Sequence, residues 1–135
     1  MIRSLELNDI DFVNELINDK NYVVNEYELN KKANVYIENN QIIAFISYKI
    51  LYERAELDYI FVKEDERKKG IASKLMREMI DDCNLNNVET IDLEVNSLNV
   101  NAIKLYQKFD FKVISKREKY YNGIDALLMM REVRK

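Results

Sequence analysis

The chain has no histidine, no proline and no tryptophan, and its 135 residues include only two glycines and one cysteine. Without histidine there is no imidazole base, no Ser-His or Cys-His nucleophile pair and no histidine ligand for a metal. The single Cys83 excludes an internal disulfide and a cysteine-rich zinc site. Acid–base chemistry is therefore left to Asp, Glu, Tyr, Lys or the thiol, and we expect no metal site.

The length and net charge of the chain limit the number of domains and the kinds of partner that we expect. A chain of 135 residues predicts a single domain, residues 1–135, that is large enough for a core. The net charge of −3 gives no general attraction to nucleic acid. No apolar run approaches the ~20 residues that span a bilayer, and residues 1–6 lack the pattern of a secretion signal. We therefore expect a cytoplasmic protein with no membrane or nucleic-acid partner.

Apolar spacing predicts alternating strands and helices. The predicted strands are 2–7, 35–37, 42–51, 57–62, 90–95, 111–121 and 124–131. The predicted helices begin after a cap at Asn8, cover 71–83, and begin after a cap at Asn99. Residues 21–32 are polar and their structure is ambiguous, so a short additional helix there is one alternative. Asn39-Asn40 and Asn122-Gly123 predict tight hairpins. This order predicts an α/β (α+β-like) fold, with a mixed, mostly antiparallel sheet of about seven strands and helices on both faces.

A short basic turn precedes the central predicted helix and reads Glu66-Arg67-Lys68-Lys69-Gly70-Ile71-Ala72-Ser73. A turn that ends in Gly and opens a helix presents free N–H groups at the positive end of the helix dipole, which suits a phosphate or pyrophosphate. The alternative is a solvated basic turn before an ordinary amphipathic helix. A Walker loop needs two glycines and a Rossmann fingerprint needs three, so neither fits the single glycine here.

A longer motif follows, Leu93-Glu94-Val95-x-x-x-Asn99-x-x-Ala102-Ile103-x-Leu105-Tyr106-x-x-x-x-Phe111. Together with the turn Arg67-x-x-Gly70-x-Ala72, it resembles the GCN5-related N-acetyltransferase (GNAT) superfamily. Within that superfamily it is most similar to the bacterial ribosomal-protein alanine N-acetyltransferases (RimI-like). The tail, Tyr120-Tyr121-Asn122-Gly123-Ile124-Asp125-Ala126-Leu127-Leu128-Met129, is similar to the ending of that family. The resemblance covers roughly residues 55–131.

The resemblance implies an acyltransferase that moves an acetyl group from acetyl-CoA to a primary amine. The implied acceptor is the N-terminal α-amine of a protein such as a ribosomal protein. Glu94 falls on the family's general base, and Tyr106 falls on the acid that faces the CoA sulfur. Strand alternation separately places Glu94 on the face opposite Leu93. The alternatives are a solvated charge for Glu94 and a core aromatic for Tyr106.

The resemblance also implies the binding residues. The cofactor contacts would be the backbone of Ile60, Phe61 and Val62 for the pantetheine arm, the turn residues Arg67, Lys68, Lys69, Gly70, Ile71, Ala72 and Ser73 for the pyrophosphate, and Asn99, which is also a predicted helix cap. Tyr120 and Tyr121 would flank a slot for a peptide N-terminus, or are plain strand aromatics. In the family the strand of residues 60–62 splays away from the strand that carries Glu94.

Two departures from the family leave the acceptor open. Residues 16–34 lack the family's Phe-Pro-Trp segment, and Ile124-Asp125-Ala126 stands where the family has Glu-Asp-Ala. Acetylation of a small amine or a lysine side chain therefore remains an alternative. A non-catalytic acyl-CoA-binding regulatory module and a structural domain without CoA are further alternatives. We expect Cys83, on the apolar face of its helix, to be a core residue rather than a nucleophile.

Overall fold

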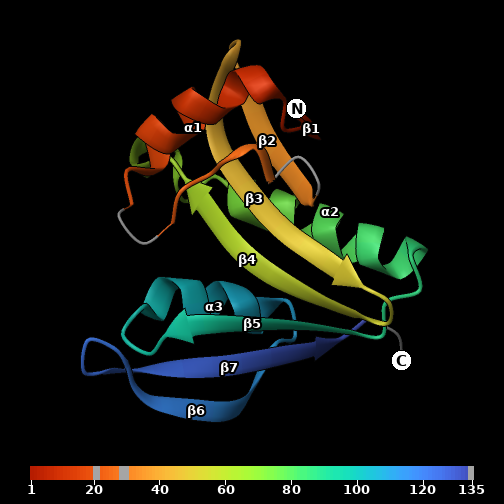
Figure 1. The fold of residues 1–135 in the computed structure, drawn as a ribbon, viewed down its shortest axis with the longest axis vertical. Helices are drawn as coiled ribbons and strands as arrows, with labels where there is room; N and C mark the ends of the chain where they lie inside the picture. The colour runs from red at the N-terminus through yellow and green to blue at the C-terminus, as the bar shows by residue number, and fades with distance from the viewer. Residues whose placement is uncertain (20–21, 28–30, 134–135) are drawn as a thin grey trace. The chain divides into compact units, whose positions relative to one another are not determined.

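The computed structural model describes residues 1–19, 22–27 and 31–133. In these residues the chain forms seven strands and three α-helices, which Figure 1 shows in chain order. The strands are β1 (Ile2–Ser4), β2 (Lys32–Glu38), β3 (Gln41–Leu51), β4 (Arg54–Val62), β5 (Thr90–Asn96), β6 (Lys112–Tyr121) and β7 (Ile124–Glu132). The helices are α1 (Ile10–Ile17), α2 (Ile71–Leu85) and α3 (Val100–Lys108), with short 3-10 turns η1 (Leu7–Asp9) and η3 (Glu64–Glu66). The predicted order of elements is confirmed. The open question of a helix within 21–32 falls partly on residues outside those described.

The strands form one sheet in the order β1-β2-β3-β4-β5-β7-β6. β4 and β5 run parallel where Arg54–Glu56 pairs with Thr90–Asp92. The pairs β1–β2, β2–β3, β5–β7 and β6–β7 are antiparallel. The parallel pair follows from the intervening helix α2, because parallel neighbours need a long crossover connection. The predicted mixed, mostly antiparallel sheet is confirmed.

The chain divides into two compact units. The first unit contains residues 1–49 and 58–79, and the second contains residues 50–57 and 80–135. The division falls within β4 and within α2. The basic turn before α2 belongs to the first unit, whereas Glu94 and α3 belong to the second.

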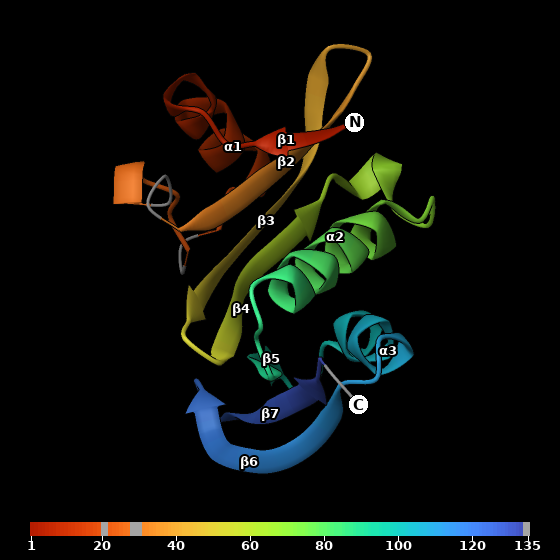
Figure 2. The same cartoon turned by 90° about the vertical axis from the view of Figure 1, so that its right-hand side faces the viewer.

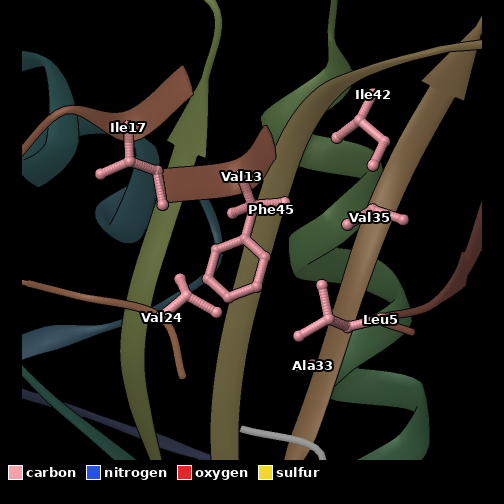
Figure 3. Packing of buried hydrophobic residues seen from close by; sticks show 8 residues of the cluster. All are labelled: Leu5, Val13, Ile17, Val24, Ala33, Val35, Ile42 and Phe45. Atoms are coloured by element: carbon pink, nitrogen blue, oxygen red, sulfur yellow. The ribbon is translucent and has the colours of Figure 1, made fainter. Parts of the chain in front are cut away.

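In the first unit, apolar side chains gather between α1 and the sheet (Figure 3). The buried members of this cluster are Leu5, Val13, Ile17, Val24, Ala33, Val35, Ile42 and Phe45. β3 is buried without alternation from Ile42 to Tyr48, as expected for a strand covered on both faces. Figure 2 shows α1 on one face of this part of the sheet and the start of α2 on the other.

The entry into α1 differs from the prediction that Asn8 caps the helix. The turn η1 precedes α1, and the Glu6 N–H donates to Asp9 Oδ2 at 2.8 Å. The Arg3 guanidinium donates two hydrogen bonds to the same carboxylate, at 2.7 and 3.0 Å, and lowers the pKa of Asp9. The Asn8 prediction was wrong because the ion pair with Arg3 places the Asp9 carboxylate, rather than the Asn8 amide, at the start of the turn.

The hairpins rest on residues with positive φ. Asn39 and Asn40 have φ of 53° and 63°, and Asn122 and Gly123 have φ of 47° and 91°, so both predicted tight turns are confirmed. A third hairpin, between β3 and β4, was not predicted. It turns through Tyr52 at φ 59°, and it extends β4 back to Arg54 instead of the predicted Leu57.

In the second unit, β5 alternates between its two faces. Ile91, Leu93 and Val95 are buried, while Asp92 and Glu94 are on the other face and partly exposed. Met129 lies opposite Leu93 on β7 and is fully buried. Arg131, opposite Ile91, donates to the Phe109 carbonyl at the end of α3 at 2.6 Å, so α3 covers the buried face. The predicted alternation is confirmed.

Candidate functional site

The basic turn at Arg67–Gly70 is built from two left-handed residues. Lys68 has φ of 64° and Gly70 has φ of 81°, and they flank Lys69 just before α2 begins. The Gly70 carbonyl accepts the Lys74 N–H at 3.1 Å, which places Gly70 at the start of the helical hydrogen bonds. A Cβ built at Gly70 would meet no atom within 4 Å. The backbone of the turn is therefore open to an approaching group.

The N-terminus of α2 adds positive potential to this turn. In a helix the first N–H groups, here those of Ile71, Ala72 and Ser73, have no acceptor within the helix. The aligned peptide dipoles place about half a positive charge there. The hydrogen bond from Lys69 Nζ to Glu66 Oε1, at 3.1 Å, raises the pKa of Lys69 and keeps that side chain charged. These groups suit an anion such as a phosphate.

The Arg67 side chain turns back from the basic turn toward the end of β4. Its Nε donates to the Val62 carbonyl at 2.9 Å, and its guanidinium lies 5.6 Å from the centroid of the Phe61 ring. The structure thus brings together three of the predicted site residues. The Arg67 side chain ties the turn to the end of β4, so we expect it to position the turn as well as add charge.

The strand residues Ile60, Phe61 and Val62 also contribute to the core. Val62 is buried, and Ile60 and Phe61 are partly buried. Phe61 packs against the cluster beneath α1. The backbone contact from this segment to a cofactor, which the resemblance implied, stays a prediction.

In the second unit, Glu94 meets a partner that the sequence did not predict. Glu94 Oε2 lies 3.5 Å from Arg117 Nη2, and the side chain of Glu94 is 26% exposed. The Arg117 guanidinium in turn lies 4.7 Å from the centroid of the Tyr120 ring. The structure therefore gathers Glu94, Arg117 and Tyr120 on β5 and β6.

Tyr106 and Asn99 are held by α3. The Asn99 side chain accepts the Ala102 N–H at 3.2 Å, which confirms the predicted cap. Tyr106 is 7% exposed, and its ring centroid lies 6.1 Å from that of Phe111. Tyr106 is thus a core aromatic. Its predicted role as an acid stays a prediction, and the two roles are compatible because packing fixes the direction of the ring.

Tyr120 and Tyr121 lie beside an irregular part of β6. Tyr120 is half exposed, whereas Tyr121 is described only through its backbone, which pairs with Ile124. The ladder shifts register between Arg117 and Tyr121, where Lys119 has φ of 51°. The Lys119 N–H donates to Asp125 Oδ1 at 3.0 Å. Asp125 therefore stabilises the irregular backbone of β6 beside Tyr120. The sequence signal for this role was that Asp125 belongs to the tail motif.

Three further observations concern Cys83, possible metal ligands and membrane-spanning helices. The Cys83 thiol is in no disulfide and has no exposed surface, as predicted for a core residue. In the described ranges, no group of three or more His, Cys, Asp or Glu side chains is arranged to hold a metal ion. No helix in the described part of the chain has the length and apolar content to cross a membrane.

The fold and the candidate site define an α/β protein with a mixed sheet and a glycine-ended basic turn that leads into a helix N-terminus. The chain matches the Acetyltransferase (GNAT) family over residues 5–111. It is 31% identical to the ribosomal protein bS18 alanine N-acetyltransferase of Escherichia coli K12, over 66% of this chain and 60% of the relative. It is 32% identical to the N-alpha-acetyltransferase of Saccharolobus solfataricus, over 96% of this chain and 91% of the relative.

Solved structures agree with this match. The crystal structure of the ribosomal-protein-S18-alanine N-acetyltransferase from Escherichia coli superposes with a TM-score of 0.88 at 25% identity, covering 100% of this chain and 94% of that chain. The protein therefore belongs to the acetyltransferase (GNAT) family, and the predicted resemblance is confirmed. The chain spans about three fifths of the length of the ribosomal-protein acetyltransferases that it matches by sequence.

Proposed function

We propose that this protein is an acetyl-CoA-dependent N-acetyltransferase whose acceptor is a primary amine, namely the N-terminal α-amine of a protein. The observation that carries the proposal is the family match over residues 5–111, which spans the basic turn, Glu94 and Tyr106. The similarity to a ribosomal-protein acetyltransferase and to an N-alpha-acetyltransferase supports this acceptor class. We further propose that residues 1–135 act as one acetyltransferase domain.

The proposed acetyl donor, acetyl-CoA, carries a pyrophosphate that suits the turn before α2. The backbone N–H groups of Ile71, Ala72 and Ser73, at the positive end of the helix dipole, would bind its oxygens, with Lys68 and Lys69 adding charge. The open space at Gly70 would admit the pyrophosphate close to the backbone. The backbone of Ile60–Val62 would pair with the pantetheine arm, and Asn99 would contact the donor from the start of α3.

The proposed reaction is direct attack of the amine on the acetyl carbon. The new C–N bond forms as the C–S bond of the thioester breaks. An α-amino group has a pKa near ~8 and is mostly protonated at neutral pH, so a base must take its proton. Glu94 would take it directly or through a water molecule, and the Tyr106 hydroxyl would give a proton to the departing sulfur. Holding the two substrates together removes the need for a covalent enzyme intermediate.

The proposal is tested by single-turnover acetyl transfer from acetyl-CoA, read by mass spectrometry. The acceptor panel contains peptides that begin with Ala, free lysine and spermidine. We expect an acetylated peptide and one equivalent of free CoA. If CoA binds and no acceptor is acetylated, the protein is a non-catalytic acyl-CoA-binding module. If CoA does not bind, the cofactor assignment is wrong.

A further inference from the structure

Three side chains of the second unit form a contact that the proposed reaction does not require. Arg117 Nη2 lies 3.5 Å from Glu94 Oε2, and the Arg117 guanidinium lies 4.7 Å from the centroid of the Tyr120 ring. One cation therefore contacts both a carboxylate and the face of an aromatic ring. The carboxylate is the side chain proposed above as the base, and the ring is that of Tyr120, which the family resemblance places beside the slot for a peptide N-terminus.

An irregularity in β6 creates this contact. Residues three apart on a regular strand point to opposite faces of the sheet, so Arg117 and Tyr120 would be separated. Between Arg117 and Tyr121 the register shifts, and Lys119 adopts a left-handed φ of 51°. Asp125 holds this conformation, since its Oδ1 accepts the Lys119 N–H at 3.0 Å and its Oδ2 lies 3.7 Å from Lys116 Nζ. The chain thus brings the Tyr120 ring to the guanidinium.

We propose that Glu94 and Tyr120 form the cation site for the ammonium group of the acceptor, and that Arg117 occupies this site in the free protein. The inference rests on the proposed acetyltransferase function and specifies how the acceptor is recognised. Guanidinium and ammonium ions bind carboxylates and aromatic faces through the same charge–charge and cation–π interactions. An arriving primary ammonium ion can therefore take the place of Arg117 at both partners.

The exposure of the pair makes this exchange feasible. The Arg117 side chain is 53% exposed, and the Glu94 side chain is 26% exposed. Ion pairs with this exposure are weak, because water screens the attraction and long side chains lose freedom when they are held. Arg117 is tethered beside the site, so it lowers the fraction of molecules that are ready to bind an acceptor. The apparent affinity for the acceptor falls by that same fraction.

The test compares acceptor kinetics of the full chain at saturating acetyl-CoA. Arg117→Gln removes the competing cation, Arg117→Lys keeps a cation, and Lys112→Gln is the matched control, since it removes one positive charge from the start of the same strand. The acceptor is a lysine-free peptide amide that begins with Ala. We expect Arg117→Gln to lower KM about three- to tenfold with little change in kcat. We expect Arg117→Lys and Lys112→Gln to remain within about twofold of the wild-type KM.

A binding measurement distinguishes failure of this inference from failure of the proposed function. Calorimetry measures binding of the same peptide, with a free or an acetylated α-amine, to protein that holds CoA. Tighter binding of the free amine alone to Arg117→Gln supports the cation site, even if the wild type transfers no acetyl group and the proposed function fails. The inference is overturned if KM or affinity is unchanged or weaker in Arg117→Gln, if kcat alone falls, or if Lys112→Gln gives the same gain.

Discussion

Tyr106 combines packing with a proposed chemical role. Its ring is 7% exposed and contacts Phe111, so the surrounding core determines where the hydroxyl points. A proton donor fixed in this way loses little freedom during the reaction, which favours catalysis by positioning. The packing of the ring and the chemistry of the hydroxyl can be separated, because phenylalanine keeps the first and removes the second.

We predict that Tyr106→Phe lowers the single-turnover rate about a hundredfold, the lower end for the loss of a general acid. CoA affinity is expected to stay within about twofold, and stability is expected to fall by no more than about 1 kcal/mol, the value of one hydrogen bond. Rapid-quench acetyl transfer, CoA titration and thermal unfolding measure the three quantities. Tyr52→Phe, at a 90% exposed tyrosine, is the control. Wild-type turnover in Tyr106→Phe would mean that the thiolate leaves without a proton from this residue.

Glu94 allows a test in which pH is the variable. We predict that Glu94→Gln slows transfer about a hundredfold at pH 7, where the acceptor α-amine is mostly protonated. The defect is expected to shrink as pH rises past about 8, the ordinary pKa of that amine, because a neutral amine needs no base. The measurement is kcat/KM against pH for both proteins.

The matched control for Glu94 is Asp92→Asn. Asp92 lies on the same face of β5 and pairs with Arg54 at 2.6 Å, so its substitution also removes a paired carboxylate from this strand. Asp92→Asn is expected to leave the pH profile of transfer unchanged. A defect in Glu94→Gln that does not vary with pH would assign Glu94 to acceptor positioning rather than to proton transfer.

At the scale of elements, short-range contacts hold the end of β4, the basic turn and the start of α2 together. Arg67 bonds back to the Val62 carbonyl, and the left-handed residues Lys68 and Gly70 redirect the chain into the helix. These contacts hold the turn in place before any ligand binds. A turn that is ordered before binding avoids the entropy loss of ordering a loop when a ligand binds.

The two glycines of the chain form a matched pair for testing this turn. Gly70 and Gly123 have φ of 81° and 91°, and a Cβ at either would meet no atom within 4 Å. We predict that valine at either position destabilises the fold by similar amounts, at least about 1–2 kcal/mol from the left-handed backbone. Only Gly70→Val is expected to weaken CoA binding, by more than about tenfold, because its side chain fills the space proposed for the pyrophosphate. CoA titration and thermal unfolding of both variants measure this. Equal CoA affinity in the two folded variants would remove the turn from the cofactor site.

At the scale of the whole molecule, local chemistry was enough to predict most elements. The apolar spacing of α2, the Asn99 cap and the turns at Asn39-Asn40 and Asn122-Gly123 depend on neighbours in sequence. The turn at Tyr52 was missed because Tyr-Glu carries none of the residues that favour positive φ. The prediction of a cap at Asn8 failed because a cap is judged from the residues next to it. Here Arg3, six residues before Asp9, pairs with the Asp9 carboxylate.

The site was predicted less completely for the same reason. The turn residues and Asn99 follow from a contiguous motif, whereas the partner of Glu94 depends on the sheet order β5-β7-β6 and on a shifted register in β6. No local pattern indicates that Arg117 on β6 reaches Glu94 on β5. The acceptor class likewise follows from no single segment, so it needs a direct measurement.

The most direct test of the central claim uses one peptide that carries both kinds of amine, an N-terminal Ala and an internal Lys. At pH 7 about one in ten α-amines is neutral, compared with about one in 2,500 lysine side chains, because their pKa values are near ~8 and ~10.4. Tandem mass spectrometry after a single turnover with acetyl-CoA locates the acetyl group. The account predicts acetylation of the α-amine of Ala. Acetylation of the Lys side chain, or none on the peptide while spermidine is acetylated, would contradict it.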